Sequence, residues 1–282
     1  MSAAKWKRGL LILNNKITDV MKKHYRVYGN GETIVLLHGS MASKEQWGSL
    51  ARVLRGNYRV ITIDLLGYGK SPMPDNPEEY DMKEESQHIL DTLAEIEDLD
   101  CYHIVGHSYG GAVGLYHAFS NQKQVTSLIL YEPMSFHLLP DDHPLLLESY
   151  EMANDIKEDI RTGNSVVGAK KFIDLWLPAG TFEHTTELEK KMLAVGVQKM
   201  VHDFRSAATV PAGVEDYQFL DIPTCLLAGK SSPTYSLCIA DIVASCLPNV
   251  EVHTVEGGHV GLFTHPHKTT PVIVDFLTKQ HQ

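Results

Sequence analysis

Short runs rich in Val, Ile and Leu, each ending in a turn that contains glycine, constrain the fold of this chain more than any other feature. Three of them lie at residues 33–37, 59–64 and 102–105. Strands that are buried on both faces of a parallel sheet have this composition. The segments between them, such as residues 43–54 and 83–99, carry apolar side chains at helical spacing. This alternation predicts an α/β fold with a mostly parallel, doubly wound sheet.

A long interval without strands divides the second half of the chain. We expect further strands and a last helix at residues 125–131, 224–228, 250–255 and 269–279. The interval between residues 131 and 224 is too long for an ordinary crossover. Three helical patterns occupy it, at residues 144–161, 165–177 and 185–207. We therefore predict a core of residues 1–133 and 217–282 with an inserted helical lid of residues 134–216.

The composition argues against several classes of partner. The 282 residues carry a formal net charge of -10, which disfavours nucleic acid and anionic membranes because phosphate binding needs clustered Lys and Arg. The sequence contains no run of about 18 apolar residues that could span a membrane. We therefore expect a small-molecule partner and no membrane insertion.

The start of the chain and its cysteines bear on the compartment. Lys5, Lys7 and Arg8 precede an apolar run of only residues 10–13, which is shorter than the apolar region of about 7–15 residues in a signal peptide. No C-x-x-C spacing relates the four cysteines, Cys101, Cys225, Cys238 and Cys246. We expect a cytoplasmic protein whose cysteines are free, buried thiols.

The segment GHSYGG, residues 106–111, joins an expected strand to an expected helix. When G-x-S-x-G occupies such a junction, the serine lies on a turn so sharp that its backbone is strained, and the glycines leave room for the turn. The hydroxyl of Ser108 then points out of the sheet, and the N-terminus of the helix favours an oxyanion beside it. We predict that Ser108 is a nucleophile. The alternative is a glycine-rich turn with an idle serine.

Two other segments carry the groups that a serine nucleophile needs. The loop at His38-Gly39 follows the first predicted strand, so we assign the oxyanion donors to the backbone N–H groups of Ser40 and Tyr109. We expect His38 itself to brace this loop. Near the end of the chain, a Gly-Gly turn allows His259 to fold back toward the nucleophile as the general base.

The histidines give no indication of a metal site. His265 and His267 form an H-P-H pair, the most suggestive arrangement among the 15 histidines. A zinc site needs at least three protein ligands, and the sequence shows no third ligand near this pair. We expect no bound metal and assign both histidines to the surface or to loop packing.

Four motifs in a fixed order point to a known family. They are HG at residues 38–39, DLLGYGKS at 64–71, GHSYGG at 106–111 and GGH at 257–259. From about residue 24 onward the chain resembles a serine-nucleophile member of the α/β-hydrolase superfamily. The resemblance implies the α/β-hydrolase fold, and hydrolysis of an ester or related acyl bond by a Ser-acid-His triad without a cofactor. It also implies a lid over the substrate pocket and a structural role for the Asp64 segment.

The acid of this triad is not at its usual place. Most members of the family carry an Asp three residues after the glycine that corresponds to Gly229, and here that residue is Ser232. A serine cannot supply the negative charge that orients the histidine and stabilises its imidazolium. The best replacement is Glu132, at the end of the preceding strand. Some haloalkane dehalogenases, which use an Asp nucleophile, take their acid from this strand end.

Two alternatives for the acid stay open. Tyr-Glu-Pro at this position also occurs in relatives that keep the usual Asp, so Glu132 could serve only to brace the first turn of the lid. Asp241, in an expected helix at residues 237–246, is the remaining candidate.

The predicted function is hydrolysis of an ester or related acyl bond of a small, largely apolar substrate through an acyl-enzyme. The expected pocket lining is apolar and consists of Met41, Phe136, Leu139, Trp176, Phe182 and Val260. Carbon–carbon bond hydrolysis or lactone opening would use the same triad. Dehalogenation by the family's usual route would need a carboxylate at position 108. A hydrolase-fold receptor with little turnover is the alternative from another class, and the missing Asp is its only support.

Overall fold

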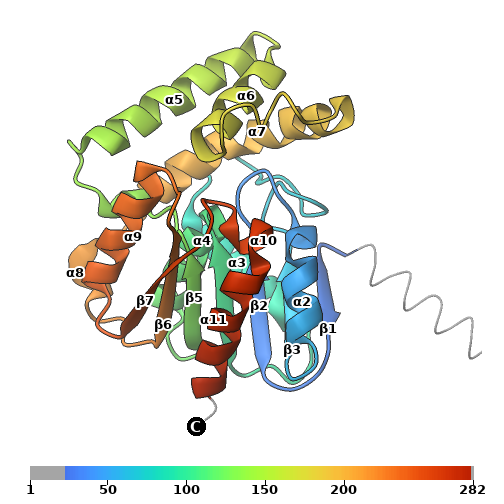
Figure 1. The fold of residues 1–282 in the computed structure, drawn as a ribbon, viewed down its shortest axis with the longest axis vertical. Helices are drawn as coiled ribbons and strands as arrows, with labels where there is room; N and C mark the ends of the chain where they lie inside the picture. Colours follow the sequence, from blue (N-terminus) through green and yellow to red (C-terminus); the bar gives the residue numbers. More distant parts are fainter. Residues whose placement is uncertain (1–22, 281–282) are drawn as a thin grey trace, which may run out of the picture.

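A seven-stranded sheet forms the centre of the computed structural model, which describes residues 23–280 (Figure 1). The strand order is β1-β3-β2-β4-β5-β6-β7. Their bounds are Tyr25–Tyr28 (β1), Thr33–Leu37 (β2), Arg59–Ile63 (β3), Tyr102–His107 (β4), Val125–Tyr131 (β5), Thr224–Gly229 (β6) and Val250–Val255 (β7). Every neighbouring pair is parallel except β1 with β3. The predicted α/β fold with a mostly parallel sheet is therefore confirmed.

Helices cover both faces of the sheet. One face carries α2 (Gly48–Leu54) and α11 (Pro266–Lys279), and the other carries α3 (Met82–Ala94), α4 (Tyr109–Ser120) and α9 (Thr234–Cys246). Successive residues of a strand point to opposite faces, so Ile34 and Val35 of β2 belong to two different apolar clusters. Both are fully buried. This two-sided burial explains why the strands read as continuous apolar runs rather than as alternating patterns.

The chain between β5 and β6 is helical. It contains η2 (Phe136–Leu138), α5 (Pro144–Arg161), α6 (Ser165–Trp176), α7 (Glu187–Ala208) and α8 (Val214–Tyr217). Figure 1 shows α5, α6 and α7 as a layer above one end of the sheet, called here the α5–α7 layer. Buried side chains of this layer, including Ile156 and Met200, join the apolar cluster that also contains Val113 of α4. The layer is therefore packed against the rest of the molecule.

Three local features differ from the sequence-based expectations. Strand β1 was not predicted, because its four residues YRVY alternate only weakly and it pairs with β3 at the edge of the sheet. Helix α3 ends at Ala94 instead of residue 99, and Asp98 beyond it has a left-handed φ of 56°. The last helix begins at Pro266, where proline suits a first helical turn.

The four cysteines are free thiols as expected, but not all of them are buried. All four cysteines are free, and Cys225 and Cys246 are buried, as predicted. Cys101 is exposed, so the prediction of burial is wrong for this residue, which lies just before β4. Within residues 23–280, none of the helices has the length and apolar character needed to cross a bilayer. The predicted features at residues 5–13 lie outside the described part of the chain.

Candidate active site

Ser108 lies on the sharp turn between β4 and α4. Its backbone has φ 54° and ψ -120°, a conformation that residues with side chains rarely adopt. The flanking glycines make this turn possible. A Cβ on Gly106 would lie 2.5 Å from the carbonyl oxygen of Gly110, and a Cβ on Gly110 would lie 2.3 Å from that of His38. The turn places the Ser108 hydroxyl at the carboxyl end of β4, beside the N-terminus of α4.

The imidazole of His259 connects Ser108 to Glu132. His259 Nε2 lies 2.9 Å from Ser108 Oγ, and His259 Nδ1 lies 2.7 Å from Glu132 Oε2. All three residues are buried, and Glu132 is 0% exposed. When Glu132 is ionised, Nδ1 carries the proton that the carboxylate accepts, which leaves Nε2 free to accept the proton of the Ser108 hydroxyl. This arrangement can increase the nucleophilicity of the serine.

Glu132 stands at the end of β5 with a strained φ of 46°. Its Oε1 accepts hydrogen bonds from the Gly229 N–H, at 2.7 Å, and from the hydroxyl of Ser232. Burial would raise the pKa of Glu132, but the hydrogen bonds from His259, Ser232 and Gly229 hold it below the ordinary value. The serine at the usual Asp position thus donates to the carboxylate. Asp241 is exposed on α9.

Three side chains fix the position of His259. The indole of Trp176, at the end of α6, stacks on its ring with centroids 4.7 Å apart. The hydroxyl of Ser236 lies 3.1 Å from Nδ1. His107 donates its Nε2–H to the His259 carbonyl oxygen at 2.8 Å. Burial and the neighbouring His259 lower the pKa of His107 to about 3, so His107 is neutral at physiological pH.

Ser40 and Tyr109 lie beside Ser108 around a small cavity. Within residues 23–280, their backbone N–H groups have no hydrogen-bond acceptor, so both can bind an oxyanion. The Ser40 hydroxyl donates to Asp203 of α7 at 2.5 Å, which ties this loop to the α5–α7 layer. Met41 follows with φ 59° and lies close to Gly196 of α7, outside the cavity lining.

Two of the sequence motifs brace loops beside this site. His38 accepts a hydrogen bond from the Leu65 N–H at 3.0 Å and donates to the Gly39 carbonyl oxygen at 2.7 Å. Asp64 is fully buried and forms an ion pair of 2.5 Å with Lys44. These contacts agree with the structural roles expected for His38 and for the Asp64 segment.

The cavity over Ser108 has a volume of about 20 Å³, enough for about one water molecule. Of the predicted pocket residues, Phe136 and Trp176 line it. Leu139 and Phe182 are buried elsewhere and do not line it. An acyl group larger than this cavity therefore requires its walls to move, and those walls include residues of the α5–α7 layer.

A larger hollow of about 690 Å³ also borders Trp176. Val260, the remaining predicted pocket residue, lines this hollow together with Ser232 and His259. Trp176 lines both the cavity over Ser108 and the larger hollow, so the two spaces approach each other at this residue.

Sequence reasoning missed several residues of the cavity wall. They are Met134, Phe172, Asp203, Phe204 and Ala207. Phe172 and Phe204 occur at helical spacing, which does not distinguish pocket residues from packing residues. Asp203 had a detectable signal, because it follows Lys199 by four residues, and the two form a buried ion pair. Burial nevertheless raises the pKa of Asp203 above its ordinary value.

Comparisons with known proteins agree with this architecture. The haloalkane dehalogenase of Agrobacterium fabrum is 36% identical over 111 residues, which cover 39% of this chain and 36% of the dehalogenase. The 2-hydroxy-6-oxononadienedioate/2-hydroxy-6-oxononatrienedioate hydrolase of Paraburkholderia xenovorans is 26% identical over 274 residues and 90% of each chain. A thermophilic esterase from Thermogutta terrifontis has a TM-score of 0.75 at 20% identity, covering 92% of this chain and 93% of the esterase.

The extent of these matches differs. The chain spans 29% to 38% of the length of three curated relatives, which include the dehalogenase. The sequence profile of the alpha/beta hydrolase family, in contrast, matches residues 34–271. Since this match includes β2 to β7 and the segments that carry Ser108, Glu132 and His259, the chain belongs to the alpha/beta hydrolase family.

Proposed function

We propose that this hydrolase cleaves an ester or related acyl bond of a small, largely apolar substrate, with Ser108 as its nucleophile. The observation that carries the proposal is the pair of hydrogen bonds at His259, 2.9 Å to Ser108 Oγ and 2.7 Å to Glu132 Oε2. A protein that only binds ligands has no need of a buried serine, histidine and carboxylate in this order. The geometry therefore favours turnover over a receptor function.

In the first step, Ser108 Oγ forms a bond to the substrate carbonyl carbon while His259 Nε2 takes the hydroxyl proton. The negative charge on the carbonyl oxygen is stabilised by the N–H groups of Ser40 and Tyr109. His259 then gives its proton to the departing alcohol oxygen, and the acyl group remains on Ser108. Glu132, which its low pKa keeps ionised, stabilises the imidazolium through Nδ1.

In the second step, water replaces the alcohol. His259 takes a proton from the water as its oxygen attacks the acyl carbon, and the same proton returns to Ser108 Oγ when the acyl bond breaks. The product is a carboxylic acid, and the enzyme returns to its starting state. The same residues thus serve both steps, and the proposal requires no cofactor.

The cavity wall favours a neutral substrate. Phe136, Phe172, Trp176 and Phe204 supply apolar surface, and Asp203 is the charged residue among the described residues of the lining. A dianion such as the dienedioate named for the Paraburkholderia relative would meet no cation among these described wall residues. Carbon–carbon bond cleavage of such a compound is therefore less well supported than hydrolysis of an uncharged ester, thioester or lactone. Haloalkane dehalogenation is disfavoured by the serine at position 108.

The α5–α7 layer is proposed to act as a lid. The cavity of about 20 Å³ is far smaller than the about 300–1,000 Å³ of ordinary ligand pockets, so substrate binding requires displacement of Trp176 or of the helix that carries it. The larger hollow reaches His259 and Trp176, so displacement of Trp176 would open a route from it to Ser108.

The test is hydrolysis of p-nitrophenyl esters with acyl chains of increasing length. The wild type should release p-nitrophenol, and Ser108→Ala should not. Ser120→Ala, on the exposed end of the same helix, is the matched control and should keep full activity. Equal activity of Ser108→Ala and the wild type would refute the proposed nucleophile. Ligand binding that raises the melting temperature without product would instead support a receptor.

A further inference from the structure

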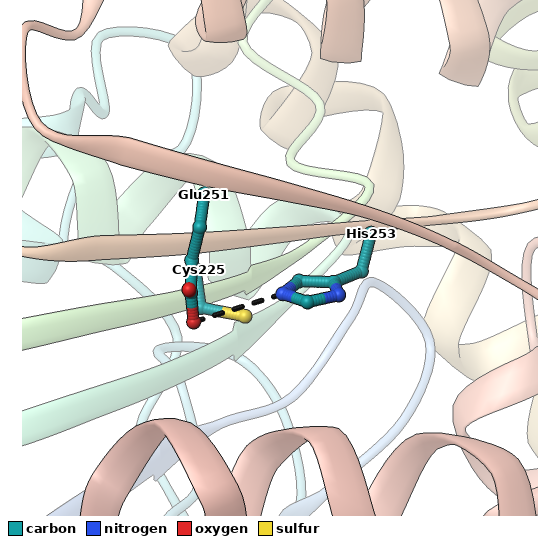
Figure 2. A group of neighbouring side chains, drawn as sticks. All are labelled: Cys225, Glu251 and His253. Carbon is teal, nitrogen blue, oxygen red and sulfur yellow. Dashed lines mark ion pairs between the residues drawn. The ribbon is translucent and has the colours of Figure 1, made fainter. Parts of the chain in front are cut away.

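Three side chains with metal-binding chemistry converge on β6 and β7. Cys225 and Glu251 are direct partners across the two parallel strands, and His253 follows Glu251 by two residues on the same face of β7. One ligand atom from each residue lies within 4.8 Å of the other two. Figure 2 shows the three side chains turned toward one another. Sequence spacing gave no sign of this cluster, because β6 and β7 are separated by α9 and meet only in the sheet.

Two polar atoms of the cluster are buried without a hydrogen-bond partner. Within the described residues, Glu251 Oε1 and His253 Nε2 have no hydrogen bond, and their contact with each other is a long ion pair of 3.6 Å. Buried polar atoms nearly always form hydrogen bonds, so two that face each other without one call for an explanation. The other carboxylate oxygen of Glu251 contacts Lys279 of α11 at 3.4 Å, which leaves Oε1 directed toward His253 and Cys225.

The position of the cluster makes these polar residues unusual. Cys225 lies among apolar side chains between the sheet and α11, in the same cluster as Leu227 and Val255. The β7 side chains that point to this face are Glu251, His253 and Val255. Two of these three are polar, although side chains between a sheet and a helix are ordinarily apolar. The ligand atoms are buried although the side chains of Glu251 and His253 are 37% and 36% exposed. An ion can therefore enter from solvent.

We propose that Cys225, Glu251 and His253 bind one Zn²⁺ ion. A thiolate, an imidazole nitrogen and a carboxylate oxygen form a ligand set that zinc accepts, with water completing a tetrahedral site. Tetrahedral zinc ligands at ordinary bond lengths lie about 3.3–3.8 Å from one another. The 3.6 Å between Glu251 Oε1 and His253 Nε2 is already in this range, and a small movement of the thiol completes it.

The charges of the site match those of the ion. The Cys225 thiol releases one proton to solvent when it binds zinc, so the thiolate and the Glu251 carboxylate together neutralise the two charges of Zn²⁺. Binding also releases hydration water from the ion, and no redox step is involved. His253 supplies the lone pair of Nε2, an atom that has no hydrogen-bond partner within residues 23–280.

The proposed ion would fasten the edge of the sheet. Among the strands of residues 23–280, β7 is the last in the sheet order and has only β6 as a neighbour. Cys225 lies at the start of β6, whereas the Ser108 site lies at the carboxyl ends of the strands, so the metal site is separate from the proposed chemistry. Zinc bound across the two strands would stabilise the edge without taking part in ester hydrolysis.

The test is binding of Zn²⁺ and Co²⁺ to the purified full chain after treatment with a chelator. Inductively coupled plasma mass spectrometry after equilibrium dialysis should find one Zn²⁺ per chain, and added Zn²⁺ should raise the melting temperature. Co²⁺ should produce the near-ultraviolet charge-transfer band of a cobalt–thiolate bond. Loss of a residue that hydrogen-bonds to a metal ligand typically weakens metal binding about 10- to 100-fold. His253→Gln removes a ligand itself, so it should weaken Zn²⁺ binding by more than this.

Matched controls separate this site from adventitious binding. Cys101→Ser removes the exposed thiol, and His267→Gln removes a histidine of the H-P-H pair, so both should leave binding unchanged. Cys225→Ser should abolish the cobalt–thiolate band. If the wild type shows no such band, or if His253→Gln binds Zn²⁺ as tightly as the wild type, the proposal is wrong. If a variant fails to fold, the presence or absence of the cobalt–thiolate band in the wild type still tests the proposal.

Discussion

The hydroxyl of Ser232 donates a hydrogen bond to the carboxylate of Glu132, whose other oxygen is bonded to His259. Ser232 stands where most members of the family carry the acid. The two positions therefore still meet, at the carboxylate of Glu132, but the charge comes from the end of β5 and the loop after β6 supplies a neutral donor. This contact gives the missing Asp a physical explanation that does not require loss of activity.

Removal of the Ser232 hydroxyl should reduce catalysis but not abolish it, because Glu132 keeps its hydrogen bond to His259. A hydrogen bond to a charged group contributes about 1.5–3 kcal/mol, and Ser232→Ala should lose part of this from transition-state stabilisation, so that kcat/KM falls about tenfold. Ser232→Thr, which keeps the hydroxyl, should be close to the wild type. Ser231→Ala, at the exposed neighbouring position, is the control. Steady-state kinetics on one p-nitrophenyl ester tests this, and full activity of Ser232→Ala would argue against the role of the donor.

The low pKa of Glu132 predicts a pH dependence of stability. A carboxylate whose pKa is lower in the folded state than its ordinary 4.5 stabilises the fold above pH 4.5, and this contribution is lost as the pH falls through the folded value. The stability advantage of the wild type over Glu132→Gln should therefore shrink as the pH falls below 4.5. Urea unfolding at a series of pH values measures this difference. A difference independent of pH down to strong acid would contradict the lowered pKa.

Trp176 should control the length of acyl chain that the enzyme accepts. Trp176 lines both the small cavity over Ser108 and the larger hollow, so we expect Trp176→Ala to join the two spaces. We expect kcat/KM for long-chain esters to rise relative to short-chain esters. The variant should also lose about 3–5 kcal/mol of stability, the usual cost of truncating a buried aromatic residue. Trp176→Phe should keep the short-chain preference, and an unchanged chain-length profile in Trp176→Ala would exclude this role.

Lys199 should be important for the stability of the contact between α7 and the core. It is 1% exposed and forms ion pairs with Glu85 and Asp203, which are equally buried. Lys199→Met would leave both carboxylates without their cation and should lower the free energy of unfolding by about 3–5 kcal/mol. Lys157→Met breaks an exposed pair with Glu78 and should cost about 0–1 kcal/mol. Equal midpoints of urea unfolding for the two variants would contradict this account.

The parts of the structure that local patterns determine could be predicted from the sequence. Strands β2, β3 and β4 are apolar runs that each lead into a turn containing glycine, and Ser108 lies on a turn that the flanking glycines permit. Glu132 was selected because parallel strands end at one edge of a sheet, and its carboxylate does lie within hydrogen-bonding distance of His259. The cavity wall, in contrast, depends on how α6 and α7 pack above the end of the sheet. The spacing of side chains along a helix does not predict that packing. The Cys225 cluster likewise exists only through strand pairing.

The most direct test of the proposed triad compares Glu132→Gln with Asp241→Asn. The two substitutions remove one carboxylate charge each, one hydrogen-bonded to His259 and one exposed on α9. With kcat/KM for a p-nitrophenyl ester as the readout, Glu132→Gln should lose about 10⁴-fold, the scale seen when a protease triad loses its acid, and Asp241→Asn should match the wild type. Full activity of a correctly folded Glu132→Gln, or a large loss in Asp241→Asn, would contradict the account.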